Sequence, residues 1–250
     1  MIRVRLAAPS EGSSLNGDDN VYAPPAADLT TTPGLRAGVP VPPYRDPGIR
    51  ARWAVAGLAA STAFAIAVYF ANPTALNPND LAHAMTLFAL LVIVAVLSIG
   101  AVVAFCMWFH RVYANLPALG HATPRFTPGW AVGYFFIPIL NLFRPYQAAR
   151  EAWIRTEDAL AGDTGGFAVE RGAGLVGVWW ALWIAMNLVS NFENMAPATS
   201  GGAADAAFLR SVQLVGVLLT TAATTAAIAM VLGLTGRQRK AAAKLGVDAR

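Results

Sequence analysis

Five polar residues that flank one short apolar stretch are the side chains best suited to binding an anion. They are Arg111, Asn115, Arg125, Asn141 and Arg144. Arginine holds a phosphate through two parallel hydrogen bonds, and polar residues at membrane depth are candidates for function. We therefore expect a polar hollow for a phosphate or a lipid head group. The same residues also have an ordinary explanation, in which arginines mark helix ends and asparagines satisfy broken backbone.

A second pair, Cys106 and His110, lies four residues apart on one helix face. A thiolate beside an imidazole can act as a nucleophile or as a metal ligand. No third ligand is near in the sequence, and Cys106 is the one cysteine of the chain. We favour a packed thiol and an interfacial histidine. We find no nucleophile–base set and no phosphate loop, and expect no catalytic residue, no metal, no cofactor and no enzyme activity.

The elements that must hold these residues are apolar helices. The chain has 250 residues, of which 56% are hydrophobic and 13% charged. Four uncharged runs each hold the ~20 apolar residues that a helix needs to cross a bilayer. They predict helices at about residues 53–71, 83–108, 174–192 and 211–234. The fold class is therefore an all-α integral membrane protein with four transmembrane helices.

The middle stretch is too short to be a fifth helix of this kind. Pro128 and Pro138 leave residues 129–143 as its apolar body, which is about 22 Å long if helical, against a bilayer core of roughly 30 Å. A proline inside a helix frees backbone groups, and lipid cannot satisfy them. We predict a re-entrant segment, followed after Pro145 by an interfacial amphipathic helix at about residues 146–160. The alternative is five spans.

The distribution of charge agrees with a segment that turns back. The connector 72–81 holds no Lys or Arg, and the loop 193–210 holds only Arg210. All other basic residues share one side if the middle stretch enters and leaves there, and the positive-inside rule makes that side cytoplasmic. The net charge of +4 then indicates contact with anionic lipid head groups and not with nucleic acid. Frequent arginine and alanine are typical of a GC-rich bacterial genome, so we expect the bacterial inner membrane, with both termini cytoplasmic.

The segments outside the membrane domain (residues 50–235) are predicted to be tails. Residues 1–48 carry half of the prolines and cannot bury enough apolar surface to fold, so we expect a disordered cytoplasmic tail. Its part from 40 to 47 could form a polyproline II ligand for a protein partner, or be a plain flexible tail. Residues 236–250 would be a basic cytoplasmic tail. The pattern indicates no particular oligomeric state.

Three segments carry a family resemblance. They are WFHRVYANL (108–116), RFTPGWAVG (125–133) and IPILNLFRPYQ (137–147), the last followed by Glu151, Ala152 and Trp153. They resemble a bacterial membrane family catalogued as domain of unknown function 4328, over about residues 50–235. The structural signature consists of Trp108, Pro128, Gly129, Trp130, Pro138, Pro145 and Trp153. The resemblance implies an integral membrane protein with helices around this block, and it supplies no activity, substrate or catalytic residue.

The sequence thus predicts a multi-pass membrane protein. We expect an interaction or scaffold role, with the proline-rich tail as the segment that binds a partner. The alternative is a small transporter or a lipid- or anion-binding module that uses the central block with Asn141 and Arg144.

Overall fold

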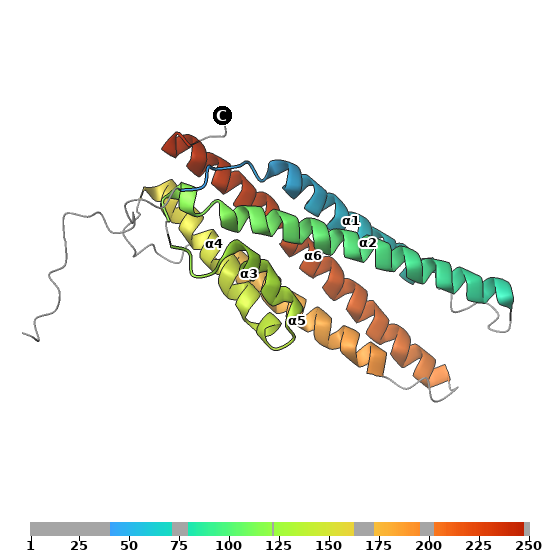
Figure 1. Cartoon of the computed structure of the whole chain (residues 1–250). Helices are drawn as coiled ribbons and strands as arrows, with labels where there is room; N and C mark the ends of the chain where they lie inside the picture. The colour runs from blue at the N-terminus through green and yellow to red at the C-terminus, as the bar shows by residue number, and fades with distance from the viewer. Residues whose placement is uncertain (1–40, 72–79, 122, 163–172, 196–202, 248–250) are drawn as a thin grey trace, which may run out of the picture. The chain divides into compact units, whose positions relative to one another are not determined.

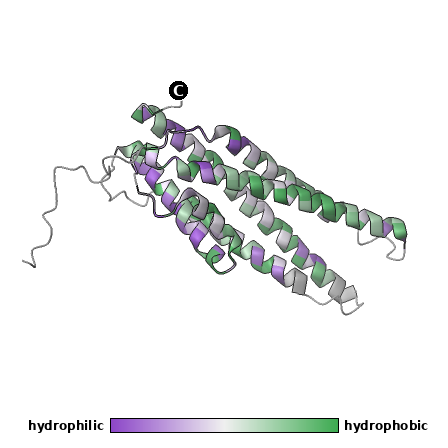
Figure 2. Cartoon of the chain, in the orientation of Figure 1, coloured by the Kyte–Doolittle hydropathy of each residue, from purple (hydrophilic) through white to green (hydrophobic). Residues whose placement is uncertain are grey.

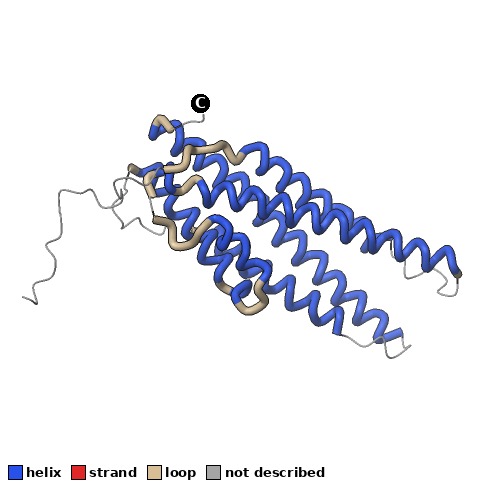
Figure 3. Tube along the Cα trace, in the orientation of Figure 1, coloured by secondary structure: helices blue, strands red, loops and turns tan. Residues whose placement is uncertain are grey.

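The computed structural model describes residues 41–71, 80–121, 123–162, 173–195 and 203–247, without the side chains of 192–195 and 203–206. This part of the chain consists of helices joined by loops, with no strand (Figures 1 and 3). The long helices are α1 (Gly48–Ala71), α2 (Leu81–Ala114), α4 (Arg144–Ala161), α5 (Gly174–Met195) and α6 (Ala203–Leu245). The short ones are η3 (Pro117–Leu119), α3 (Pro128–Gly133), η4 (Tyr134–Phe136) and η5 (Leu140–Leu142).

Four of the described helices, α1, α2, α5 and α6, are long and apolar enough to cross a membrane. Protein does not cover much of their apolar surface, and Phe88 and Val96 of α2 are 68% and 64% exposed. In Figure 2 much of the ribbon of α2 has the green of hydrophobic residues. Large exposed apolar surface is expected where helices face lipid. The protein is therefore an all-α multi-pass membrane protein, as predicted.

The best-packed core lies at the end of the bundle where α1 begins and α2 and α6 finish, which we call the basic end. α2 has 34 residues and α6 has 43, so both exceed the roughly 30 Å of a bilayer core at about 1.5 Å per residue. Their last turns pack on each other, and the Trp108 indole donates to Thr235 Oγ1 at 2.9 Å. Tyr113 and Leu234 are fully buried in the same core.

The helices at this end extend further than the sequence predicts. α1 begins at Gly48, and Tyr44 before it is buried against Leu119 and Ala159. α6 continues to Leu245 through residues predicted to form a tail. The apolar side chains needed for this packing come from η3, α4 and α6, which lie far apart in the sequence. Of the predicted disordered segment 1–48, residues 1–40 lie outside the described residues.

The central segment, residues 126–144, turns back on itself, as a re-entrant segment would. It begins as α3 and η4, passes through Pro138, and returns as η5. The Arg144 guanidinium at its end lies 5.7 Å from the ring of Phe126 at its start, so the chain enters and leaves at one place. Its tip is apolar and open, with Ile139 73% exposed. This tip is suited to lipid tails.

α4 packs within the bundle. Ala148, Ala152 and Trp153 are buried, and the Trp153 ring lies against Gly233 of α6, where an added Cβ would meet it at 3.2 Å. The apolar side of the helix predicted to be interfacial therefore contacts protein. Asp158 of the same helix is buried as well.

Candidate functional site

Glu151 of α4 holds the start of the central segment in place. Its carboxylate accepts hydrogen bonds from the Tyr113 hydroxyl of α2 and from the Arg125 backbone N–H, the latter at 2.8 Å. Arg155, one turn later on α4, pairs with the same carboxylate at 2.8 Å. The Tyr113 hydroxyl in turn accepts from the Phe126 N–H at 3.1 Å. One carboxylate thus joins α2, the loop and α4.

The loop before this segment is tied to α4 by a second set of contacts. His121 Nε2 lies 2.6 Å from the Arg155 carbonyl oxygen, so this nitrogen carries the proton and donates. Arg155 also donates to the Thr123 carbonyl at 3.2 Å. Burial lowers the pKa of His121 below its ordinary value of 6.5. The imidazole is therefore neutral at pH 7.

The end of the central segment presents an arginine enclosed by aromatic rings. The Arg144 guanidinium lies within 6 Å of the rings of Phe126, Tyr134 and Phe143, in the range of cation–π attraction. It donates to Gln147 Oε1 at 3.2 Å, while its Nε is buried without a hydrogen-bond partner. The Trp180 indole of α5 donates to the Leu142 carbonyl at 3.2 Å and fixes the returning chain.

Between the loop and the exposed face of α4 lies a hollow of about 700 Å³, which we call the arginine hollow. Its lining includes Arg125, Gln147, Arg150 and Arg155, together with His121, Tyr146, Glu151, Ile154 and Asp158. Glu151 is already engaged by Tyr113, Arg125 and Arg155. The Arg125 guanidinium lies over the Phe126 ring and forms no ion pair with any described residue. The hollow therefore offers positive charge and hydrogen-bond donors to an anion.

The structure does not bring the five predicted site residues together at one point. Arg125 lines the hollow. Arg144 lies beside it, where the end of the central segment meets its start. Asn141 follows the proline turn, and its buried side-chain oxygen accepts no hydrogen bond from the described residues. Arg111 lies one turn after Met107, whose carbonyl accepts from Arg50 of α1. Asn115 is inside the core.

Asn115 anchors the residues before α1 to the bundle. Its amide donates to the Arg45 carbonyl at 2.9 Å and its oxygen accepts from the Arg45 N–H at 3.2 Å. It also donates to Gln238 Oε1 at 3.1 Å, and Gln238 donates to the Val112 carbonyl at 2.9 Å. Asp46 forms a two-bond ion pair with Arg239 at 2.8 and 2.7 Å. The Arg239 hydrogen bonds lower the pKa of Asp46, so this contact is charged at pH 7.

Sequence reasoning missed Tyr113, Gln147 and Gln238. Tyr113 resembled any aromatic residue at a membrane interface, and Gln238 lay in a segment predicted to be a tail. Glu157 lies on α4 one turn after the buried Trp153. It accepts from the Trp153 indole at 3.1 Å and pairs with Arg237 at 3.4 Å. The only sequence signal for this ion pair was a carboxylate on an apolar helix face, because a carboxylate in such a place needs a basic partner.

The signature residues build the scaffold of the central segment. Pro128 begins α3 directly after Thr127, whose hydroxyl accepts from the Trp130 N–H at 3.3 Å. Trp130 is half exposed and packs on Tyr134, Gly129 has open space beside it, and Pro138 lies exposed in the turn. Pro145 is buried in the first turn of α4, where its missing N–H leaves no donor unpaired.

Among the described residues, Cys106 and His110 have no partner that would make them reactive. Cys106 is a half-buried free thiol and His110 is exposed. No group of three His, Cys, Asp or Glu side chains gathers anywhere in the described ranges.

The neutral state of His121 predicts an acid-sensitive loop. Because its pKa is lowered in the folded protein, the unfolded chain binds the proton first as the pH falls through 6.5, and stability falls with it. We expect the melting temperature to drop between pH 7.5 and pH 5.5. His121→Gln, whose amide can still donate to the Arg155 carbonyl, should reduce that drop. An unchanged pH dependence in this variant would contradict the assignment.

Comparison with known proteins identifies one match. The family model described as Domain of unknown function (DUF4328) matches residues 72–236, which include α2, the central segment, α4 and α5. No curated protein and no solved structure matches the chain.

Proposed function

Because the chain belongs to the DUF4328 family, whose description states no activity, we propose a function from the site: the arginine hollow binds the head group of an anionic phospholipid. The single observation that carries the proposal is the position of this hollow. It lies beside the place where the start and the end of the central segment meet, at Phe126 and Arg144. The apolar tip of that segment is exposed. A bound lipid would place its phosphate at the arginines and its tails along the tip.

The arrangement of charge supports the same orientation in the membrane. The described basic side chains other than Arg210 lie at the basic end, on residues 45–52, 111–155 and 237–244. By the positive-inside rule this end faces the cytoplasm. We therefore propose an inner-membrane protein with both termini cytoplasmic and the hollow at the inner leaflet. The proposed role is binding and not catalysis.

The test compares two double variants of the full-length protein. Each basic residue near anionic lipid contributes about 1 kcal/mol, so Arg125→Gln/Arg150→Gln should weaken retention of phosphatidylglycerol by about tenfold or more. Retained lipid is measured by native mass spectrometry after reconstitution in mixed phosphatidylglycerol and phosphatidylcholine. Arg52→Gln/Lys240→Gln removes the same charge from exposed positions at the same end and is the matched control.

We expect the control to change retention by less than about twofold, since its residues lie outside the hollow. Equal losses in both double variants would mean that the lipid responds only to overall charge, and the hollow would not be a site.

A second role is favoured by the anchor at Asn115. Because Arg45 and Asp46 are fixed to the bundle, the chain before them starts from the basic end, where a cytoplasmic partner could reach it. We propose that residues 1–40 carry a protein-binding segment. Tyr44 and Pro47 are buried and are not part of it. Cross-linked partners should be lost on deletion of residues 2–40 while membrane insertion is retained; partners kept by the deleted chain would exclude this role.

A further inference from the structure

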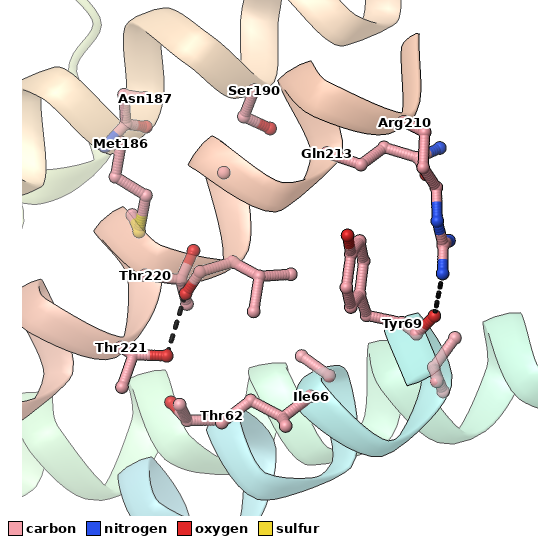
Figure 4. A pocket seen from close by; sticks show the side chains of 14 residues that line it. Thr62, Ile66, Tyr69, Met186, Asn187, Ser190, Arg210, Gln213, Thr220 and Thr221 are labelled. Carbon is pink, nitrogen blue, oxygen red and sulfur yellow. Dashed lines mark hydrogen bonds between the residues drawn. The ribbon is translucent and has the colours of Figure 1, made fainter. Parts of the chain in front are cut away.

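A second polar cavity lies between α1, α5 and α6, toward the ends opposite to the basic end (Figure 4). Its volume is about 390 Å³, which is within the range of small-ligand sites. Its polar lining consists of Thr62, Asn187, Ser190, Arg210, Gln213, Thr220 and Thr221. No Asp or Glu is among the described residues that line it. The charge of this described lining therefore comes from Arg210, which favours an anion.

Arg210 is held at one side of the cavity by α1. Its guanidinium donates to the Tyr69 carbonyl at 2.7 Å and stacks over the Tyr69 ring at 4.0 Å, as Figure 4 shows. Only one of its five N–H donors is used by these contacts. It forms no ion pair with a described residue, although it lies within the apolar span 207–245. An oriented arginine with unused donors in such a span is suited to an oxyanion.

The rest of the lining provides uncharged hydrogen-bonding groups. The side chains of Ser190, Gln213 and Thr220 form no hydrogen bond with other described residues. The Asn187 side-chain nitrogen donates to the Trp183 carbonyl at 2.7 Å, and its side-chain oxygen accepts no hydrogen bond from the described residues. Gln213 follows Arg210 by three residues, about 4.5 Å along a helix, so one small ligand can reach both. The cavity therefore joins one anion-binding group to several groups that suit hydroxyls.

The inner limit of the cavity is closed. Thr62 and Thr224 share a hydrogen bond of 2.9 Å, and beyond them lies a separate, mostly apolar cavity lined by Leu58, Phe105 and Trp179. Closure at this depth favours a binding site over an open path.

We propose that this cavity binds a phosphate ester with a hydroxyl-bearing alcohol part, with the phosphate on Arg210 and the hydroxyls on Gln213 and Ser190. The chemistry is shared by two sources: a soluble ester such as glycerol 3-phosphate and the head group of phosphatidylglycerol in the outer leaflet. The site is separate from the arginine hollow, and neither depends on the other.

The experiment uses the full-length protein in nanodiscs. In phosphatidylcholine discs, glycerol 3-phosphate is titrated by calorimetry; in discs that also contain phosphatidylglycerol, retained lipid is counted by native mass spectrometry. Arg210→Gln should weaken binding by about tenfold or more in one arm. Gln213→Leu, which removes the amide at similar volume, should weaken it several-fold while leaving Arg210 and Tyr69 in contact. Arg52→Gln, at an exposed position of the basic end that lines neither cavity, is the control and should not change it.

The arm that responds identifies the source of the ligand. Binding in neither arm would overturn the proposal, and so would a loss of the same size in Arg52→Gln. If Arg210→Gln does not fold, Gln213→Leu decides, and unchanged binding in that variant would overturn the proposal.

Discussion

Trp153→Ala is expected to lower the free energy of unfolding by about 3–5 kcal/mol, the range for truncation of a large buried aromatic side chain. Trp153 is 2% exposed. Its ring lies against Gly233 and under the Arg237 guanidinium at 4.3 Å, and its indole N–H donates to Glu157. The substitution leaves a cavity between α4 and α6 and removes the indole from Glu157. The quantity to measure is the stability of the purified protein in mild detergent by denaturant titration.

Trp130→Ala is the matched control, because it removes the same side chain from a position that is 54% exposed. We expect its effect to be below about 1 kcal/mol. Similar losses in the two variants would show that α4 is not seated on α6 through Trp153.

Asn115→Leu is the second substitution with a large expected effect. It removes the partner of Gln238 Oε1 and both hydrogen bonds to the Arg45 backbone. Each buried polar group left unpaired costs about 1–3 kcal/mol. We expect a loss of stability in that range or above it, and faster tryptic cleavage after Arg45, since the chain before α1 is no longer fixed.

Asn141→Leu supplies the comparison for this experiment. The Asn141 side-chain oxygen is buried without a partner, so an apolar replacement should leave stability nearly unchanged or raise it. Cleavage after Arg45 should not change. If Asn141→Leu were as destabilising as Asn115→Leu, the two asparagines would not differ as the structure indicates.

The helices and the turn of the central segment could be predicted because their causes are local. Long uncharged runs are sufficient to identify α1, α2, α5 and α6, and Pro138 with the short length of its segment predicts that the chain turns back. Pro145 correctly marks the first turn of α4. In both cases the free-energy cost comes from backbone groups that would lack hydrogen bonds in lipid, and this cost depends only on residues close in the sequence.

The partners across the bundle could not be predicted, because they join residues distant in the sequence. Asn115 and Gln238 are 123 residues apart, and Tyr113 and Glu151 are 38 apart. Nothing near Arg111 in the sequence shows that it lies on the α1 side of α2, away from Arg125. The sequence predicts a tail at the end of α6 because basic residues are frequent there. Ala241 and Ala242 of this segment are nevertheless buried against the residues before α1. Such pairings follow from packing and not from local pattern.

Cysteine labelling tests most directly the claim that the central segment turns back and brings its arginines to one surface. Single cysteines at Thr123, Ala161 and Leu81, all exposed positions, are introduced after Cys106→Ala and treated with a membrane-impermeant maleimide in intact and permeabilised cells. The account predicts that positions 123 and 161 are labelled together, only after permeabilisation, and that position 81 is labelled in intact cells. Labelling of 161 together with 81, while 123 stays protected, would mean that the segment crosses the membrane and would contradict the account.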